Sequence, residues 1–201
     1  MTPLTVTKFD RTEEELQYFW IYCIIVAGKN SDWASRTTGK LFRRKPQGML
    51  PFEFLRNEGH GLHNTLIANR VGQYKRITEA IQQSYDIDLA TCTIEDLEKI
   101  YGVGPKTARF FILHSRRDSE CAVLDTHILR YLRDKKLSIK IPKVTPQNRS
   151  TYEQLSDLVI SFIKMDFPNL SLAEADLLIW SNYSGRFNND IKFAEDIFNK
   201  N

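Results

Sequence analysis

The chain has 201 residues, 42% of them hydrophobic, which is enough for one domain of moderate size with a real core. Its net charge of +3 is small, but residues 101–150 hold eleven Lys and Arg against four Asp and Glu, while residues 151–201 hold four against eight. This basic excess fits a nucleic-acid partner and equally an ordinary solvated face. Three scattered cysteines exclude a disulfide framework and a four-cysteine metal site, and they favour a reducing compartment.

No segment has the pattern of a targeting or membrane-spanning sequence. The N-terminus lacks a basic stretch followed by an apolar one, and the apolar run from Trp20 to Ala27 is too short to cross a bilayer. We therefore expect an intracellular protein without membrane contact, in the cytoplasm or nucleoid of a prokaryote or in the nucleus of a eukaryote.

The first hundred residues predict a series of helices. Thr12 and Glu15 form a capping box before an apolar-periodic helix that ends near Ala27, and Asp32 is the expected N-cap of the next helix. Pro and Gly residues then break the chain before a short turn. The expected segments in chain order are helices at 12–27 and 32–41, a turn at 52–57, a helix from about residue 60, and an amphipathic helix through 77–81.

The last third of the chain has the same character. A basic connector at 135–143 precedes a helix at 152–163, which ends near Phe167 and Pro168. Ser171 and Glu174 form another capping box, which opens a helix through Trp180, and a final short helix is expected at 191–198. No stretch alternates with period two between hairpin turns, so the fold class is expected to be all-α.

The most informative stretch is a predicted helical hairpin at residues 93–115. Apolar periodicity is interrupted by Gly102-Val103-Gly104-Pro105 and resumes at Lys106 and Thr107. The glycines allow a tight turn, and Pro105 suits the first turn of a helix. Such a turn presents backbone N–H groups at the positive end of a helix dipole, which suits the phosphate backbone of a nucleic acid.

Asp125 is the second notable residue. It follows the short apolar run Ala122-Val123-Leu124 and precedes a helix that carries Ile128, Leu129 and Leu132. Asp is a preferred N-cap residue, so a purely structural role is one interpretation. A hairpin that only binds backbone does not need this carboxylate, so its presence together with Lys106 favours an enzyme.

These residues resemble the helix-hairpin-helix DNA glycosylases. The pattern Gly-Val-Gly-x-Lys-Thr-Ala is matched at residues 102–108, and the family's Val-Asp-Thr-His-Ile-like stretch is matched at 124–128. The resemblance implies that Lys106 is the catalytic amine and that Asp125 is the catalytic carboxylate. It also implies that Gly102, Val103, Gly104, Lys106 and Thr107 bind the DNA backbone.

The resemblance further implies a single domain over 1–201 with two helical lobes around a central cleft. We expect one lobe from about 1–27 plus 137–201, and the other from about 28–136 with the hairpin at 93–115. In the family, the loop after the first helix fills the gap left by an extruded nucleotide, which makes Lys29 and Asn30 candidates for minor-groove contacts. Either residue could equally lie in an ordinary solvent loop.

The branch of the family is indicated by the C-terminal third. Residues 172–180 with Tyr183-Ser184-Gly185 look like the corresponding region of type-2 8-oxoguanine DNA glycosylases, whose Trp faces the base, so Trp180 is a candidate for the base pocket. A core role for Trp180 is equally open. The closing Lys of that branch has its matching place near Asn189, and a tail at 190–201 continues beyond it.

The expected activity is that of a bifunctional DNA glycosylase and AP lyase that removes oxidised bases from double-stranded DNA as a monomer. No cofactor or metal is expected, because an iron–sulfur cluster usually needs four Cys ligands and no Cys follows Cys121. The alternatives are an endonuclease III-like enzyme for oxidised pyrimidines, a glycosylase for another base modification, and a helix-hairpin-helix module that binds DNA without chemistry.

Overall fold

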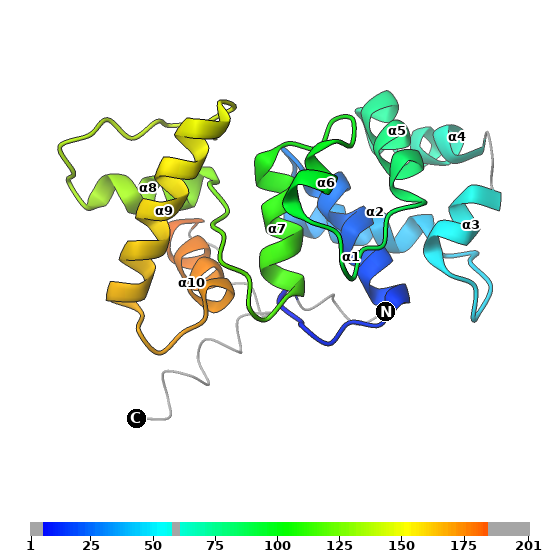
Figure 1. Cartoon of the computed structure of the whole chain (residues 1–201). Helices are drawn as coiled ribbons and strands as arrows, with labels where there is room; N and C mark the ends of the chain where they lie inside the picture. The colour runs from blue at the N-terminus through cyan, green and yellow to red at the C-terminus, as the bar shows by residue number, and fades with distance from the viewer. Residues whose placement is uncertain (1–5, 58–60, 185–201) are drawn as a thin grey trace. The chain divides into compact units, whose positions relative to one another are not determined.

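The computed structural model describes residues 6–57 and 61–184, and all regular secondary structure in these residues is helical (Figure 1). The expectation of an all-α protein is confirmed for this part of the chain. The helices are α1 Glu13–Val26, α2 Ser31–Leu41, α3 Pro51–Asn57, α4 Gly61–Ala68, α5 Tyr74–Ser84, α6 Ile94–Glu98, α7 Pro105–Ser115, α8 Thr126–Asp134, α9 Arg149–Asp166 and α10 Leu172–Ser184. Within the described ranges, no helix is long and apolar enough to span a bilayer.

The described residues form two compact units, with 9–111 in unit 1 and 6–8 plus 112–184 in unit 2. This division differs from the predicted lobes, because α1 packs with α2, α3 and α5 inside unit 1, and α8 packs with α10 inside unit 2. The reason for the first difference lies in α1, which is buried on nearly all sides from Leu16 to Ile25. A helix that is apolar all round takes a central position in the nearest core.

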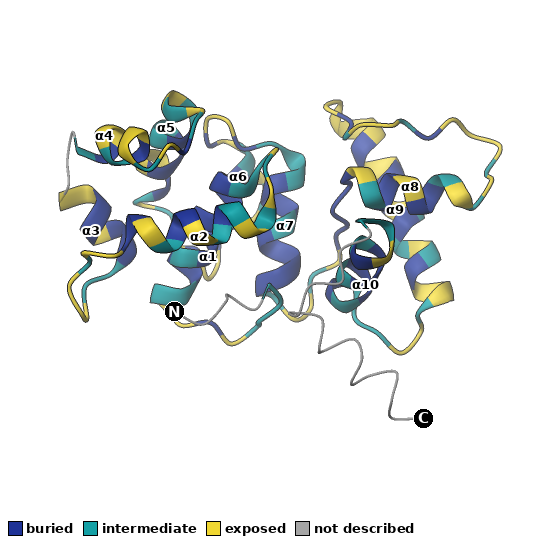
Figure 2. Ribbon diagram, turned by 180° about the vertical axis from the view of Figure 1, so that it is seen from behind, coloured by how far each residue is buried: buried dark blue, intermediate teal, exposed yellow. Residues whose placement is uncertain are grey.

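The core of unit 1 joins α1 to α7. Phe19 and Trp20 of α1 and Phe111 of α7 are each 0% exposed, and the Trp20 and Phe111 rings meet edge to face with centroids 5.1 Å apart. The buried Trp20 indole donates a 2.7 Å hydrogen bond to the Ser84 hydroxyl at the end of α5. Figure 2 shows α7 as mostly buried. The hairpin turn, which precedes α7, is therefore attached to a helix that packs into the core.

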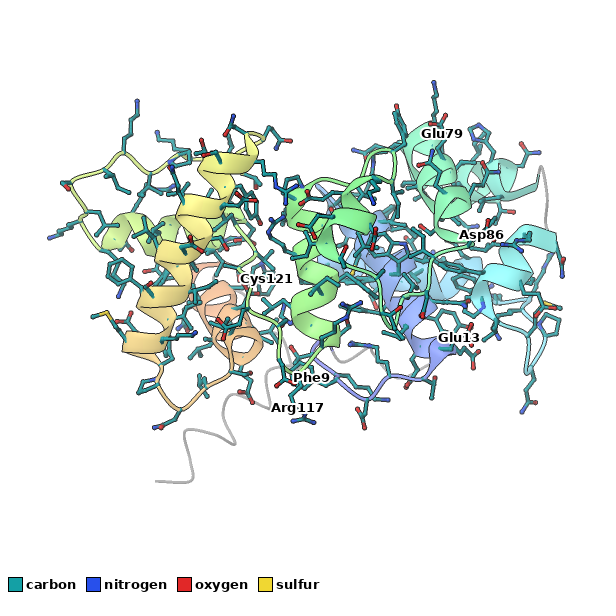
Figure 3. All side chains as sticks on the ribbon, in the orientation of Figure 1. Phe9, Glu13, Glu79, Asp86, Arg117 and Cys121 are labelled. Atoms are coloured by element: carbon teal, nitrogen blue, oxygen red, sulfur yellow. The ribbon has the colours of Figure 1, made fainter. Side chains whose placement is uncertain are left out.

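Some helix boundaries differ from those predicted. α2 begins at Ser31, because the side chain of Asn30, and not that of Asp32, accepts the capping hydrogen bond from the Trp33 amide. The expected turn at 52–57 is the short helix α3, whose Phe52 amide donates to the Gln17 side chain at 2.8 Å. The Arg56 side chain of α3 forms a 2.8 Å ion pair with Asp86, which Figure 3 labels.

The core of unit 2 is built from α8, α9 and α10. Its centre includes Leu129 and Leu132 of α8, Tyr152 and Val159 of α9, and Ile179 of α10. The capping box predicted at Ser171 is present, since the Glu174 carboxylate accepts from the Ser171 amide at 2.8 Å. The expected helix at 191–198, the tail at 190–201, Gly185, Asn189 and His60 lie outside the described residues.

Candidate nucleic-acid interface and reaction site

The predicted hairpin is formed by α6, the turn at 99–104 and α7. Gly102 has φ +73°, a conformation that favours glycine, and it is exposed at the tip of the turn. Val103 is buried, and its amide donates a 3.1 Å hydrogen bond to the Ile100 carbonyl. Pro105 begins α7, as expected from its fixed φ and missing N–H group.

The turn leaves backbone donors available. The Thr107 and Ala108 amides donate to the Gly104 carbonyl at 3.0 Å and 3.2 Å. Within the described part of the chain, the amides of Gly102, Gly104 and Lys106 donate no hydrogen bond. Free amides at the start of a helix, with the helix dipole behind them, attract an anionic group such as a phosphate.

An ion pair fixes the two hairpin helices to each other. The Arg109 guanidinium of α7 lies 2.5 Å from the Glu98 carboxylate of α6, and the two side chains are 7% and 17% exposed. Arg109 also donates to the Pro105 carbonyl at 3.3 Å. A largely buried ion pair of this kind fixes geometry more than it adds stability, so it keeps the turn in one conformation.

Lys106 differs from Arg109 in its surroundings. It is the second residue of α7 and is half-buried. Among the described residues, no side chain or carbonyl forms a hydrogen bond or ion pair with the Lys106 amine. The amine is therefore not committed to a structural contact and can act on a bound molecule.

Asp125 is the N-cap of α8, as the sequence predicts. Its Oδ1 accepts hydrogen bonds from the amides of His127 and Ile128, both at 2.8 Å, and the residue is 8% exposed. No hydrogen bond or ion pair to its Oδ2 is present in the described residues. The second carboxylate oxygen is therefore available for another role.

Sequence reasoning missed the residues that hold the segment before Asp125. Residues 121–124 lie outside any helix, and side chains bind several of their backbone groups. The hydroxyl of Tyr152 accepts from the Leu124 amide at 2.9 Å and donates to the Ala122 carbonyl at 3.1 Å. The Thr145 hydroxyl donates to the Leu124 carbonyl at 2.8 Å. The apolar periodicity of 152–163 marks Tyr152 as buried but gives no sign of this function.

Trp180 lies near the end of α10 and is half-buried. Its indole meets the His127 ring edge to face, with centroids 5.9 Å apart, so it stands beside the first turn of α8. Asp125, His127 and Trp180 are therefore neighbours within unit 2. This placement is compatible with both the base-pocket role and the core role considered for Trp180.

Lys29 and Asn30 both have partners inside unit 1. The Lys29 amine donates to the Val71 carbonyl and lies 4.8 Å from the centre of the Trp33 ring. Asn30 caps α2 through its side-chain oxygen, 3.1 Å from the Trp33 amide. The contact between Lys29 and Val71 could not be predicted from local sequence, because Val71 is distant in the chain. The minor-groove role of both residues stays a prediction.

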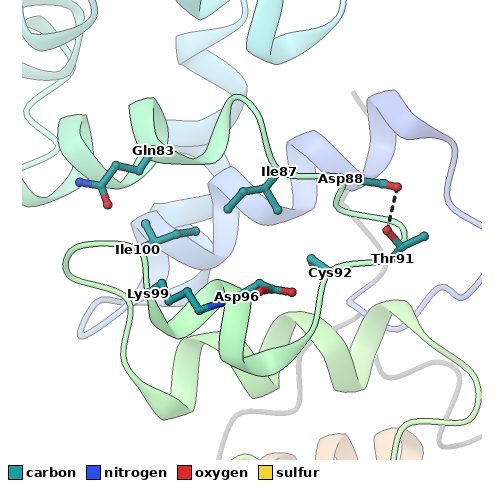
Figure 4. Close-up of a pocket in the computed structure, with 8 residues that line it drawn as sticks. All are labelled: Gln83, Ile87, Asp88, Thr91, Cys92, Asp96, Lys99 and Ile100. Carbon is teal, nitrogen blue, oxygen red and sulfur yellow. Dashed lines mark hydrogen bonds and ion pairs between the residues drawn. The ribbon is translucent and has the colours of Figure 1, made fainter.

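A hollow of about 470 Å³ lies beside α6 and contains none of the predicted site residues (Figure 4). Its polar groups stabilise nearby turns. Asp88 accepts from the Ala90 amide at 2.9 Å and from the Thr91 hydroxyl at 2.8 Å, and Asp96 caps α6. We therefore do not place the reaction here. Across the described ranges, no three His, Cys, Asp or Glu side chains are grouped to hold a metal ion.

The predicted site residues are divided between the units. Lys29, Asn30 and the hairpin residues through Thr107 belong to unit 1, whereas Asp125 and Trp180 belong to unit 2. The structure brings the five hairpin residues together at one turn. It also brings Asp125 and Trp180 to the same end of α8, as neighbours of His127.

Two solved structures are similar to this chain over most of its length. The crystal structure of the 8-oxoguanine DNA glycosylase of Methanocaldococcus jannaschii is 23% identical, with 88% of this chain and 81% of that chain covered and a TM-score of 0.62. That of the 8-oxoguanine DNA glycosylase of Thermotoga maritima is 20% identical, with 89% and 84% covered and a TM-score of 0.63. No protein-family model and no curated protein sequence matches the chain. The chain has the helical fold of these two 8-oxoguanine DNA glycosylases.

Proposed function

We propose that this protein is a bifunctional DNA glycosylase and AP lyase that removes oxidised bases, with 8-oxoguanine as its preferred substrate. The observation that carries the proposal is the uncommitted amine of Lys106 in the first turn of α7, directly after the free amides of Gly102 and Gly104. A phosphate bound by the turn would bring a nucleotide within reach of a primary amine. The fold shared with two 8-oxoguanine DNA glycosylases supports the same activity.

The chemistry begins with a base that has left the duplex, because a paired base is inaccessible to a side chain. The unprotonated Lys106 amine attacks C1′, and the bond from C1′ to the base breaks, with its electron pair leaving on the base, which then takes up a proton. The nitrogen then loses a proton, the bond from C1′ to the ring oxygen breaks with its electron pair on that oxygen, the oxygen takes up a proton, and a Schiff base between Lys106 and C1′ results. Loss of a proton from C2′ then expels the 3′ phosphate, which cuts the strand.

Asp125 would act as the carboxylate of this reaction. Positive charge develops on the sugar as the base leaves, and an ionised carboxylate stabilises it and assists proton transfer. The free Oδ2 of Asp125 supports this role, because the capping of α8 needs only Oδ1.

The other predicted residues take part in binding. Gly102, Val103, Gly104, Lys106 and Thr107 would bind the backbone of double-stranded DNA through the hairpin turn. Lys29 and Asn30 would lie toward the gap left by the extruded nucleotide. Trp180 would offer a flat face to the extruded base, since an aromatic ring stacks on any base.

The decisive experiment is borohydride trapping on duplexes that carry single lesions, under single-turnover conditions. Borohydride reduces a Schiff base to a stable covalent adduct, so trapping reports amine chemistry and lesion choice together. We expect 8-oxoguanine opposite cytosine to react faster than thymine glycol or dihydrouracil. A pocket that hydrogen-bonds one base edge leaves its groups unpaired with a wrong base, at about 1–3 kcal/mol for each group.

The matched variants are Lys106→Gln and Lys99→Gln. Lys99 is an exposed lysine just after α6 that pairs with Asp96 at 3.0 Å. Lys106→Gln should abolish trapping and strand cleavage and leave most duplex binding intact, whereas Lys99→Gln should retain trapping, strand cleavage and duplex binding. Full trapping by Lys106→Gln would refute the assignment of the amine. Faster removal of the pyrimidine lesions would favour an endonuclease III-like enzyme, and binding without reaction would favour a non-catalytic module.

A further inference from the structure

One side chain of unit 1 connects the hairpin turn to two other segments. Arg76, in the first turn of α5, donates through Nη1 to the Gly102 carbonyl at 3.1 Å and through Nη2 to the Ile24 carbonyl near the end of α1 at 2.9 Å. Its Nε donates to the Gln73 side-chain oxygen at 2.8 Å. The planar guanidinium therefore holds three segments in a fixed relation, which an ammonium group could not do.

The contact between Arg76 and the hairpin is close. A Cβ atom added at Gly102 would lie 2.3 Å from Cγ of Arg76 and 2.9 Å from its Cδ. Gly102 is therefore needed for two reasons: its φ of +73°, and the space that the Arg76 stem occupies. The hairpin turn therefore packs directly against the aliphatic stem of Arg76.

The direction of the Gly102 carbonyl has an electrostatic consequence. A carbonyl oxygen that faces a phosphate repels it, whereas an amide N–H group attracts it. By accepting from Arg76, the Gly102 carbonyl is held toward the protein. The Gly102 carbonyl therefore does not compete with the amides of Gly102 and Gly104 for the charge of a phosphate.

The charge of Arg76 is not neutralised by its partners. The groups that bind it are carbonyl and amide oxygens, and those that bind Lys29 are the Val71 carbonyl and the Trp33 ring. Burial lowers the pKa of both side chains, and the positive charge of Arg76 lowers that of Lys29 further. Two cations bound to neutral groups give this end of unit 1 a positive potential, which attracts phosphate.

We propose that Arg76 is a positioning residue for DNA binding, which orients the hairpin turn through the Gly102 carbonyl and supplies positive charge behind it. The ligand is the phosphodiester backbone of duplex DNA. The inference rests on the part of the proposed function in which the hairpin binds DNA, and it is independent of the reaction at Lys106.

The test measures binding of an undamaged duplex by fluorescence anisotropy. Arg76→Met keeps the stem and removes the charge and hydrogen bonds, and it should weaken binding about tenfold, the usual effect of losing hydrogen bonds from a charged group. Arg76→Lys keeps the charge and loses the planar set of hydrogen-bond donors, and it should have an intermediate affinity. Arg56→Met removes an exposed cation of the same unit that is paired with Asp86, and it should bind within about twofold of wild type.

A second measurement separates positioning from general damage to the fold. At saturating DNA, Arg76→Met should trap an abasic-site duplex at a rate within about threefold of wild type, because Arg76 would act on binding and not on chemistry. Gly102→Ala should also weaken binding, and its effect should be smaller in an Arg76→Ala background, where the clash with Cγ is absent. Independent, multiplicative effects of the two changes would contradict the proposed contact.

Wild-type affinity in Arg76→Met would overturn the inference. Full affinity in Arg76→Lys would show that Arg76 acts through its charge and does not orient the turn. These outcomes differ from failure of the proposed function. If wild-type protein binds duplex and traps no lesion, the reaction is wrong, while the Arg76 series still decides the binding role. If trapping depends on Lys106 and binding does not depend on Arg76, the proposed reaction stands and the binding role of Arg76 is wrong.

Discussion

Asp125 combines a structural and a chemical role that substitution can separate. Its Oδ1 caps α8 by accepting from two amides at 2.8 Å, whereas its Oδ2 has no partner in the described residues. Asn and Asp are similarly good N-caps, because both offer a side-chain oxygen. Only Asp carries the negative charge that the proposed reaction requires.

We therefore predict that Asp125→Asn keeps stability and loses activity. Its free energy of unfolding should stay within about 0.5 kcal/mol of wild type, since the cap survives, whereas Asp125→Ala should lose about 1 kcal/mol. The single-turnover rate of base removal should fall by about 10² or more in both variants. Urea denaturation and lesion kinetics on the same preparations test this. An active Asp125→Asn enzyme would limit Asp125 to the structural role.

Some residue-level features followed from sequence and others did not. The tight turn at Gly102 and the N-cap at Asp125 are local properties of the chain, and both are confirmed. The contacts of Arg76 with Gly102 and of Lys29 with Val71 join segments far apart in the sequence. No periodicity or spacing indicates such pairs, because they arise only when the helices have packed.

Tyr152 links α9 to the segment at 121–124, which leads into Asp125. It is 0% exposed, and its hydroxyl serves both the Leu124 amide and the Ala122 carbonyl. In a sheet, a neighbouring strand would satisfy these backbone groups, and here one side chain does so. Buried backbone groups without partners are rare in folded proteins because each one is costly.

We predict that Tyr152→Phe destabilises the protein by about 2–4 kcal/mol, since it leaves two buried backbone groups without their partner. The ring and its packing remain, so the effect reports the hydroxyl. Tyr183→Phe is the matched control: its hydroxyl donates to Asp134 at 2.9 Å at an exposed site, and its loss should cost less than about 0.5 kcal/mol. Equal urea midpoints for the two variants would contradict the role given to Tyr152.

At the scale of helices, the sequence predicted where helices begin better than it predicted which helices pack together. The capping boxes predicted at Thr12 and Ser171 are both present, because each depends on residues three apart, and Thr93 forms a third with Asp96. The grouping of α1 differed from the prediction, since apolar periodicity indicates that a helix is buried without indicating which helices bury it. The start of α2 two residues earlier than predicted reflects competition between two good capping residues, Asn30 and Asp32.

At the scale of the whole molecule, each unit contains an aspartate that favours its ionised form. In unit 1, hydrogen bonds from Thr93 and then Lys99 lower the pKa of Asp96 from 3.8 to about 2. In unit 2, hydrogen bonds from Lys135 and then the Tyr131 hydroxyl lower the pKa of Asp166 below 3.8. The native state therefore binds fewer protons than the unfolded chain between about pH 4 and pH 2.

We predict that, because of these two carboxylates, the free energy of unfolding decreases as the pH is lowered through that window. A lowered folded pKa gives a contribution that is fully present above the unfolded value of 3.8 and is lost as pH falls through the folded value. Asp96→Asn and Asp166→Asn should each be less stable than wild type at pH 6, and each difference should shrink as pH falls below 3.8. Urea midpoints at constant ionic strength measure this. A difference independent of pH would mean that the hydrogen-bonding geometry, and not the charge, supplies the stabilisation, because only the charged form is lost on acidification.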